Sequence, residues 1–266
     1  MRNLSSRDNP RIKLVHALAN QARERRKLGQ TLLDGTHLIT AAIEAGVTVL
    51  EVFVSESGLN NGEILDLLER LPADVQRNLV SDALFAHFSP VETPSGILAL
   101  IAIPSVSTEV ARGGSIVILD AVQDPGNLGT ILRTAAAAGI AAAWLTPGCA
   151  QAWSPKALRA GMGAHFHLPI AEQVDAFAAL ADFSGRALAT GLGANARSVY
   201  ETDLSGPIAW LFGAEGQGLS ASLFARADGV VTIPMAAGIE SLNVGAAAAI
   251  CLFEQRRQSA IESPAG

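Results

Sequence analysis

The stretch that decides the fold is SIVILDAVQDPGNLGTILRTAAAAG, residues 115–139. It begins with the apolar run Ser115–Leu119, passes through a turn rich in Asp, Gly and Pro, and ends in an alanine-rich apolar segment. A short apolar run bounded by a turn is typical of a buried strand, and the segment from about Leu128 to Ala138 is long enough for a helix. The stretch therefore predicts a strand, a turn and a helix, in that order.

Similar strand-like runs recur through the rest of the second half. They are separated by helix-like segments and comprise Ala141–Leu145, Arg186–Thr190, Ile208–Phe212 and Val230–Ile233. Apolar runs that alternate with helices predict a parallel sheet covered on both faces. In such sheets ligands bind beyond the carboxyl ends of the strands, so polar residues just after these runs are the candidate site residues.

The first half combines shorter β-like runs with amphipathic segments. The β-like runs are Thr31–Asp34, Val49–Val54 and Gly96–Ile103. One helical face is marked by Ile64, Leu67, Leu68 and Leu71. This pattern predicts a smaller α/β domain.

The predicted boundary between the two halves is a short polar segment that contains Gly, Pro and Ser. Such a composition is typical of a connection between separately packed units. We place a linker at residues 105–114, between a first domain at 1–104 and a second domain at 115–266.

Composition bounds the class of protein. The chain has 266 residues and is 49% apolar, which favours two packed domains over disorder. Its two cysteines, Cys149 and Cys251, lack the spacing of a disulfide framework or a zinc site. The apolar runs are shorter than the roughly 18 residues of a membrane span, and the charged N-terminal segment does not resemble a secretory signal. We therefore expect a soluble protein of the reducing cytoplasm.

Charge is distributed unevenly along the chain. Residues 1–30 hold eight Lys and Arg residues and two acidic residues, whereas the whole chain has a net charge of −6. A basic segment on an acidic body fits either RNA contact or a solvated helix face, and charge alone does not separate the two. The candidates for RNA binding are Arg11, Lys13, Arg25, Arg26, Lys156 and Arg159.

Three short blocks stand at the ends of predicted strands. They are Asn127–Arg133, Gly213–Gly218 and Ile233–Val244. Each alone is ordinary turn chemistry, because Asn127 and Ser241 can cap the helices that follow. The glycines around Glu215 permit positive φ and the close approach of a ligand. Arg133 is a lone cation in an apolar helix and could simply extend to solvent, although its helical phase with Asn127 suggests a joint site.

Two other patterns are weaker. Residues 191–196, GLGANA, match a dinucleotide-binding fingerprint, but no acidic residue ends a following strand at the required distance. His165 and His167 have no Cys, Asp or Glu near them at metal-ligand spacing, so we expect no metal site. Because the fingerprint at residues 191–196 lacks its acidic residue, a nicotinamide-dependent oxidoreductase is the least favoured alternative.

Together, in this order and approximate spacing, the three blocks resemble the motifs of the SpoU family of RNA ribose methyltransferases. Ser154–Pro169 also resembles the segment between the family's motifs. Asn9–Lys13 and Leu33–Gly35 are similar to the substrate-binding domain that accompanies many members, a ribosomal protein L30e-like α/β unit. A mild departure is Gly245-Ala246 after the third block, where members often carry a small polar residue.

The resemblance implies an α/β fold in which a C-terminal parallel-sheet domain contains a trefoil knot and a smaller L30e-like domain precedes it. It implies S-adenosylmethionine as the cofactor, a homodimer, and RNA as the partner, with large-subunit ribosomal RNA favoured over transfer RNA. By residue match, the cofactor-binding residues are Thr190, Gly191, Gly213, Ile233, Met235 and Leu242. The polar residues expected to take part in catalysis are Asn127, Arg133, Glu215, Ser241 and Asn243.

Transfer of a sulfonium methyl group to a ribose hydroxyl requires in-line positioning and removal of a proton, and it requires no metal. In the family the arginine is often regarded as the base, but a guanidinium stays protonated throughout the ordinary pH range. We therefore hypothesise that Arg133 binds the phosphate next to the target ribose, while Glu215 or water takes the proton. The main alternative is a noncatalytic RNA-binding or ribosome-assembly protein on the same fold.

Overall fold

The computed structural model describes four stretches of the chain: residues 1–91, 93–106, 113–193 and 195–262. The chain forms two compact units. The N-terminal unit comprises Met1–Ser105 and Trp153–Phe166, and the C-terminal unit comprises Val106–Ala152 and His167–Gly266. Residues 107–112 of the predicted linker lie outside the described residues.

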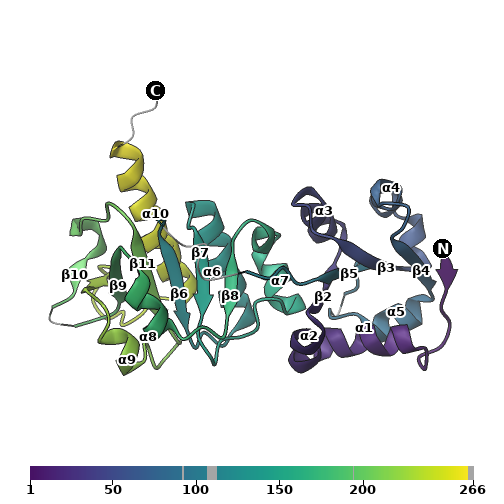
Figure 1. The fold of residues 1–266 in the computed structure, drawn as a ribbon, viewed down its shortest axis with the longest axis horizontal. Coiled ribbons are helices and arrows are strands. Elements are labelled where there is room, and N and C mark those ends of the chain that lie inside the picture. The colour runs from purple at the N-terminus through teal and green to yellow at the C-terminus, as the bar shows by residue number, and fades with distance from the viewer. Residues whose placement is uncertain (92, 107–112, 194, 263–266) are drawn as a thin grey trace. The chain divides into compact units, whose positions relative to one another are not determined.

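The N-terminal unit contains a five-stranded mixed sheet in the order β1-β4-β3-β5-β2. Its strands are β1 (Arg2–Asn3), β2 (Gln30–Asp34), β3 (Val49–Ser55), β4 (Gln76–Val80) and β5 (Ile97–Ala102). Its helices are α1 (Pro10–Asn20), α2 (Ala22–Leu28), α3 (Thr36–Glu44), α4 (Gly62–Arg70), α5 (Asp82–Phe88) and α7 (Pro155–Gly161). The predicted small α/β unit is therefore present, with α1 and α5 on one side of the sheet and α3 and α4 on the other (Figure 1).

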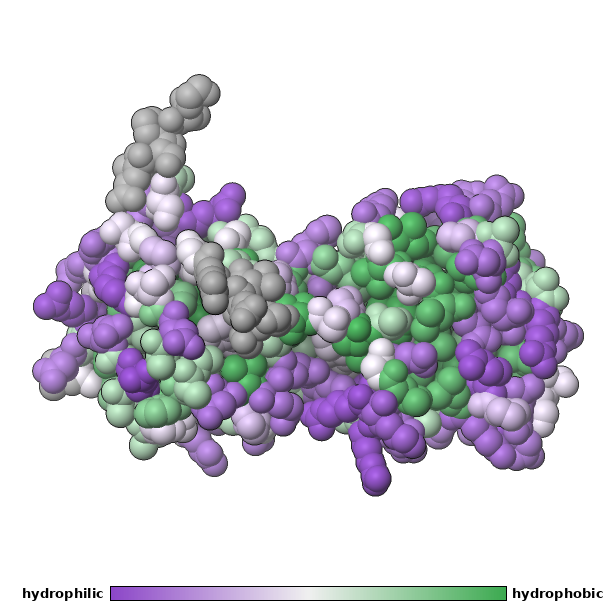
Figure 2. Space-filling model, in the orientation of Figure 1, coloured by the Kyte–Doolittle hydropathy of each residue, from purple (hydrophilic) through white to green (hydrophobic). Residues whose placement is uncertain are grey.

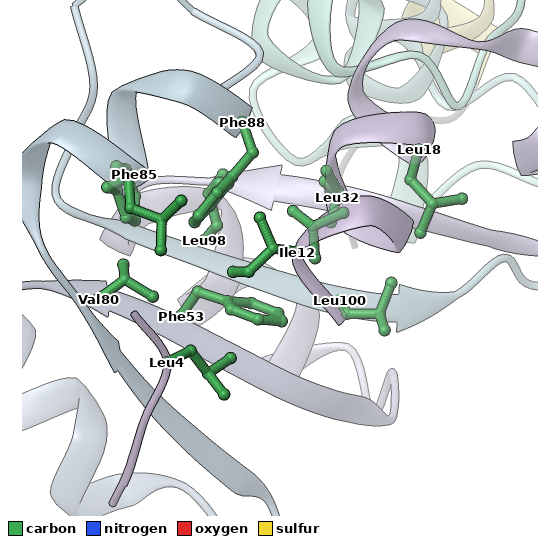
Figure 3. Close-up of a cluster of buried hydrophobic side chains, with 12 residues drawn as sticks. Leu4, Ile12, Leu18, Leu32, Phe53, Val80, Phe85, Phe88, Leu98 and Leu100 are labelled. Atoms are coloured by element: carbon green, nitrogen blue, oxygen red, sulfur yellow. The ribbon is translucent and has the colours of Figure 1, made fainter. Parts of the chain in front are cut away.

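A hydrophobic cluster joins α1 and α5 to the sheet. Ile12 of α1 and Phe88 of α5 are fully buried against Phe53 of β3 (Figure 3). The rings of Phe53 and Phe88 meet edge to face with centroids 5.8 Å apart, an arrangement that aromatic quadrupoles favour. Burial of these side chains supplies the main driving force for folding of the unit.

The segment Trp153–Phe166 packs with the N-terminal unit although the chain on both sides of it belongs to the C-terminal unit. The hydroxyl of Thr31 in β2 donates a hydrogen bond to the Trp153 carbonyl at 2.6 Å. Helix α7 then begins with Ser154 as its N-cap and Pro155 in its first turn. The sequence suggested two continuous domains, 1–104 and 115–266, which would place this segment in the second one. Those limits stay a prediction.

The C-terminal unit contains a seven-stranded sheet in the order β10-β12-β9-β11-β6-β7-β8. Its strands are β6 (Ile116–Asp120), β7 (Ala142–Leu145), β8 (Ile170–Glu172), β9 (Arg186–Thr190), β10 (Arg197–Ser198), β11 (Ile208–Gly213) and β12 (Gly229–Thr232). All neighbouring pairs are parallel. The parallel sheet predicted for this half is therefore confirmed, and the sequence pattern missed only the short edge strands β8 and β10.

Helices cover both faces of this sheet, and the alternation of side chains along the strands explains how. Its helices are α6 (Pro125–Ala138), α8 (Ala176–Ala179), α9 (Ala221–Phe224) and α10 (Val244–Glu262). Leu211 of β11 belongs to a buried cluster with α8 and α9. Its neighbour Trp210 points to the opposite face, where its indole N–H donates to Gln255 of α10 at 2.7 Å. Within the described residues, no helix combines the length and apolar character that a membrane crossing requires.

Candidate active site at the ends of the parallel strands

A cavity of about 780 Å³ lies in the C-terminal unit, at the carboxyl ends of β9, β11 and β12 and beside the start of α10. Its volume is within the range of about 300–1,000 Å³ that is typical of small-molecule sites. The position is the one expected for a parallel sheet, where loops at the carboxyl ends of strands converge. This cavity is the candidate site.

The structure brings most of the predicted site residues to this cavity. The six predicted cofactor-binding residues line it: Thr190, Gly191, Gly213, Ile233, Met235 and Leu242. Three of the predicted catalytic residues also line it: Glu215, Ser241 and Asn243. Their separate roles stay predictions, but residues of the second and third blocks do line one cavity.

Glu215 is presented by a glycine turn that closes on itself. After β11, the Ala214 N–H donates to the Gly218 carbonyl at 3.1 Å, and the Gly218 N–H donates back to the Ala214 carbonyl at 2.9 Å. A Cβ atom on Gly213 would lie 2.1 Å from the carbonyl carbon of Gly218, so no side chain fits there. Gly216 has a φ of 83°, which favours glycine. The turn therefore fixes where the Glu215 backbone stands.

Helix α6 begins earlier than predicted, and its cap is a different residue. Asp124 is the N-cap, and its carboxylate accepts a hydrogen bond from the Asn127 N–H at 2.8 Å. Pro125 occupies the first turn, where its fixed φ and missing N–H are tolerated. The capping role considered for the Asn127 side chain is therefore wrong, and its amide is available for other bonds.

Helix α10 shows the same kind of correction. The side-chain oxygen of Asn243 accepts hydrogen bonds from the N–H groups of Gly245 at 2.9 Å and Ala246 at 3.2 Å. Asn243 therefore caps this helix, as Asn side chains commonly do. Ser241, which the sequence suggested as the cap, instead lines the cavity.

The two asparagines and the glutamate form a chain of hydrogen bonds. The Asn243 side-chain nitrogen donates to the side-chain oxygen of Asn127 at 2.9 Å. The side-chain nitrogen of Asn127 donates in turn to a carboxylate oxygen of Glu215. Because the Asn243 oxygen is held by the helix N–H groups, the direction of both amides follows, and the chain ends at the Glu215 acceptor.

Arg133 is not part of this arrangement within one chain. Its side chain is exposed, it does not line the cavity, and it has no hydrogen bond or ion pair with another described residue. Six positions along an α-helix turn the side-chain direction by about 240°, so Arg133 and Asn127 lie on different faces of α6. The joint site inferred from their helical phase is therefore wrong for a single chain.

The candidate RNA-binding residues fall into two groups. Arg11 forms an ion pair with Glu51, and Lys13 pairs with Asp8 at 2.8 Å. Arg25 is only 5% exposed, and its guanidinium donates to the Leu18 carbonyl of α1. The RNA-binding role predicted for Arg25 is therefore wrong, because its charged group is used inside the unit.

The other candidates are accessible. Arg26, Lys156 and Arg159 are exposed in the N-terminal unit. Figure 2 shows hydrophilic side chains gathered over α2, the helix that carries Arg26. These three residues stay candidates for RNA contact, and so do Arg11 and Lys13, whose paired side chains are still 42% and 62% exposed.

Several residues that line the cavity were not among the predicted site residues. Glu240 directly precedes Ser241 in the third block and lines the cavity, so its place in the block was an available signal. Val244, Ala247 and Cys251 line the cavity from α10 and share the i, i+3, i+7 spacing of one helix face. Burial raises the pKa of the Cys251 thiol to about 12, so this residue is an unreactive wall at neutral pH.

The histidines do not form a metal site in the described part of the chain, which holds no group of three or more His, Cys, Asp or Glu residues in a metal-binding arrangement. His165 is buried and His167 is exposed. In the fingerprint-like stretch 191–196, Gly191 lines the cavity and Ala194 lies outside the described residues.

Comparison with known proteins gives a consistent set of similarities. Residues 114–253 match the model of the SpoU rRNA Methylase family, and residues 9–99 match that of the MRM3-like substrate binding domain. The chain is 35% identical to an uncharacterized tRNA/rRNA methyltransferase of Synechocystis, over 99% of this chain and 96% of the relative. It is 33% identical to the 23S rRNA (guanosine(2553)-2'-O)-methyltransferase RlmP of Bacillus subtilis, over 96% and 100%. The crystal structure of AdoMet-bound rRNA methyltransferase from Sinorhizobium meliloti superposes with a TM-score of 0.82 at 28% identity, covering 96% of this chain and 97% of that one.

Proposed function

This chain belongs to the SpoU rRNA methylase family and is an S-adenosylmethionine-dependent RNA ribose 2'-O-methyltransferase, and we propose that its substrate is large-subunit ribosomal RNA. The Bacillus subtilis relative, which matches this chain over its whole length, is named for 23S rRNA. The match to a substrate-binding domain over residues 9–99 also supports a large, structured substrate.

The cavity fits S-adenosylmethionine by its size and its chemistry. Ile233, Leu242 and Val231 give it apolar walls for a purine ring, and glycine-rich backbone lets a ligand approach closely. Its charged lining residues among those described are two carboxylates, Glu215 and Glu240. These complement a donor that carries a sulfonium and an ammonium group. We assign the predicted cofactor-binding residues to this task.

Methyl transfer places distinct demands on the chain's own residues. When bound, S-adenosylmethionine supplies an electrophilic methyl group. Glu215 is the group that can accept the proton of the ribose 2'-hydroxyl, because one of its carboxylate oxygens is held by Asn127 and the other is not. Asn127 and Asn243 keep the carboxylate in place, so that the proton is removed where the methyl group arrives. Ser241 lines the same wall and is suited to orient the sugar.

Arg133 requires a second chain in this scheme. We propose a homodimer in which Arg133 of one copy binds the phosphate next to the target ribose at the cavity of the other, since it does not reach its own cavity. Arginine suits this role because its planar group binds phosphate through two parallel hydrogen bonds. The trefoil knot expected for the family and a cytoplasmic location belong to the same proposal.

A mixing experiment tests the dimer. Arg133→Ala and Glu215→Ala variants are each expected to be inactive, but a mixed dimer has one cavity with an intact Glu215 and a partner's intact Arg133. Recovery of RNA methylation on mixing is the expected result. No recovery, with mixed dimers present by native mass spectrometry, would place Arg133 in its own chain's site.

The observation that carries the proposed function is the hydrogen-bond chain that ends at Glu215 beside a cavity of suitable size. Calorimetry with S-adenosylmethionine and mapping of ribose methylation in ribosomal RNA, from cells with and without the protein, test it directly. Binding of the donor and loss of one methylated position in large-subunit RNA are expected. Absence of donor binding would instead support a noncatalytic RNA-binding protein.

A further inference from the structure

Asp120, the last residue of β6, is a buried carboxylate that the reaction scheme does not use. It is 8% exposed, and both of its oxygens have donors. One oxygen accepts from the Thr146 hydroxyl at 3.0 Å, and the other accepts from the Ser220 N–H at 2.7 Å. A buried carboxylate needs such partners because its charge has lost hydration.

The Ser220 bond ties Asp120 to the turn that carries Glu215. Gly213 is the residue paired with Asp120 where β11 and β6 lie side by side. The chain leaves the sheet at Gly213 and folds back through the Ala214–Gly218 pair. It then reaches Ser220, whose N–H is held by Asp120. The outgoing limb of the glycine turn therefore lies beside Asp120 in the sheet, and the returning limb is hydrogen-bonded to its carboxylate.

The Thr146 bond ties Asp120 to the loop that carries Asn127. The Thr146 oxygen accepts a hydrogen bond from the Ala121 N–H at 3.1 Å. Ala121 has a φ of 53°, a left-handed conformation that is strained for a residue with a Cβ atom. This kink turns the chain from β6 toward Asp124 and so toward Asn127. The hydrogen bond from the Ala121 N–H to the Thr146 hydroxyl oxygen holds this strained conformation in place.

We propose that Asp120 is a positioning residue for methyl transfer. It anchors the two segments that carry Asn127 and Glu215 to one point, and so keeps their hydrogen bond aligned at the edge of the cavity. This role rests on the proposed function, because alignment of Glu215 has a catalytic consequence only if Glu215 takes the proton. The same anchor also predicts restrained motion of the glycine turn, which is measurable without the reaction.

Two substitutions at this position separate the role from general stability. Asp120→Ala removes both acceptors. Asp120→Asn keeps an oxygen for the Ser220 N–H, and its amide nitrogen can donate to Thr146 if that hydroxyl turns to the Pro147 carbonyl, 3.3 Å away. The matched control is Asp228→Ala. The Asp228 carboxylate accepts from the backbone N–H of Ala187, at the opposite end of the sheet from the cavity, at 2.7 Å.

Single-turnover methylation of ribosomal RNA under saturating donor gives a rate constant and an amplitude. For Asp120→Ala we expect the rate constant to fall about 10- to 100-fold with the amplitude kept, because small misplacements of reacting groups have effects of this size. Asp120→Asn should recover most of the rate, and Asp228→Ala should match the parent chain. Hydrogen exchange of the peptide covering residues 213–222 should be faster in Asp120→Ala and close to normal in Asp120→Asn.

Three results would overturn the role of Asp120: an unchanged rate constant in Asp120→Ala, a loss confined to the amplitude, or an Asp120→Asn variant as slow as Asp120→Ala. A loss confined to the amplitude would mean that fewer molecules are folded, which is a structural effect alone. If the parent chain binds no S-adenosylmethionine in calorimetry, the proposed function fails. The exchange data would still test whether Asp120 anchors the turn.

Discussion

Two glutamates, one in each unit, are held by an asparagine amide, and they differ in what happens to the second carboxylate oxygen. In the N-terminal unit, Glu51 is 4% exposed, accepts from the Asn78 amide at 2.7 Å, and also binds the guanidinium of Arg11. In the C-terminal unit, Glu215 accepts from Asn127 and has no second donor among the described residues. Both carboxylate oxygens of Glu51 are bonded to protein donors, whereas Glu215 keeps one oxygen free beside a cavity.

Solvation explains the difference. A carboxylate at a buried position such as Glu51 must have partners for both oxygens, because an unpaired buried charge is strongly destabilising. Glu215 is exposed to solvent in its glycine turn, so it can stay partly unpaired. The fully hydrogen-bonded Glu51 is therefore suited to stabilising the fold, and the partly hydrogen-bonded Glu215 is suited to accepting a proton.

The largest expected effect tests the structural side. Glu51→Ala should lower the free energy of unfolding by about 3 kcal/mol, since it empties a buried position, breaks the ion pair with the half-exposed Arg11 and leaves the buried Asn78 amide without its main acceptor. Glu215→Ala should change it by less than about 0.5 kcal/mol, as for other exposed positions. Urea unfolding of the full chain, with hydrogen exchange of β3 to identify the unit, measures both. Equal effects of the two substitutions would remove the contrast.

Replacing each of the two glutamates with glutamine tests the role of Glu215 in catalysis. Glu215→Gln should reduce the single-turnover rate at least about 100-fold, because general-base catalysis contributes effects of this size. The thermal midpoint should stay close to that of the parent chain. Glu51→Gln is the control, and it should leave the rate nearly unchanged in the folded fraction. Near-normal turnover in Glu215→Gln would exclude its carboxylate as the base and leave water in that role.

The sequence predicted the framework of this comparison but not its details. Apolar runs were long enough to locate the central strands, and the second and third blocks identified two of the strand ends that converge on the cavity. The caps were misassigned because the turns before α6 and α10 each contain more than one residue able to cap. Pro125 was a usable signal, since proline favours the first helical position and so points to Asp124.

Other features depend on contacts between distant parts of the chain. Nothing local shows that Arg25 is buried while Arg26, beside it, is exposed. The packing of Trp153–Phe166 with the N-terminal unit follows from its fit against β2, which no pattern within the segment reveals. Asp120 was not selected because its partners, Thr146 and Ser220, lie 26 and 100 positions away.

A smaller effect sharpens the account of how Glu215 is held. Asn243→Ala removes the cap of α10 and should cost about 1 kcal/mol of stability. It should also slow methyl transfer, because Asn127 then loses the donor that fixes the direction of its amide. Ser241→Ala is the matched variant from the same block, and it should leave helix stability unchanged. A stability loss in Ser241→Ala equal to that in Asn243→Ala would contradict the capping assignment.

The smallest effect extends the comparison to a third glutamate, Glu254 in α10. Like Glu51, it has both carboxylate oxygens bonded to protein donors. Hydrogen bonds from Arg257, and then from Gln258, lower the pKa of this carboxyl to about 2, from an ordinary value of 4.5. Because the folded-state pKa is the lower one, the stabilisation is present above about pH 4.5 and is lost as the pH falls toward 2. Arg257 is partly exposed, so Glu254→Gln should cost only about 0.5–1 kcal/mol near neutral pH. That difference from the parent chain should shrink through the acid range in urea unfolding, and Glu201→Gln, at an exposed position in the same unit, is the control substitution. If the loss of unfolding free energy in Glu254→Gln did not depend on pH, packing rather than charge would hold this glutamate. The number of hydrogen-bond donors would then no longer distinguish structural carboxylates from Glu215.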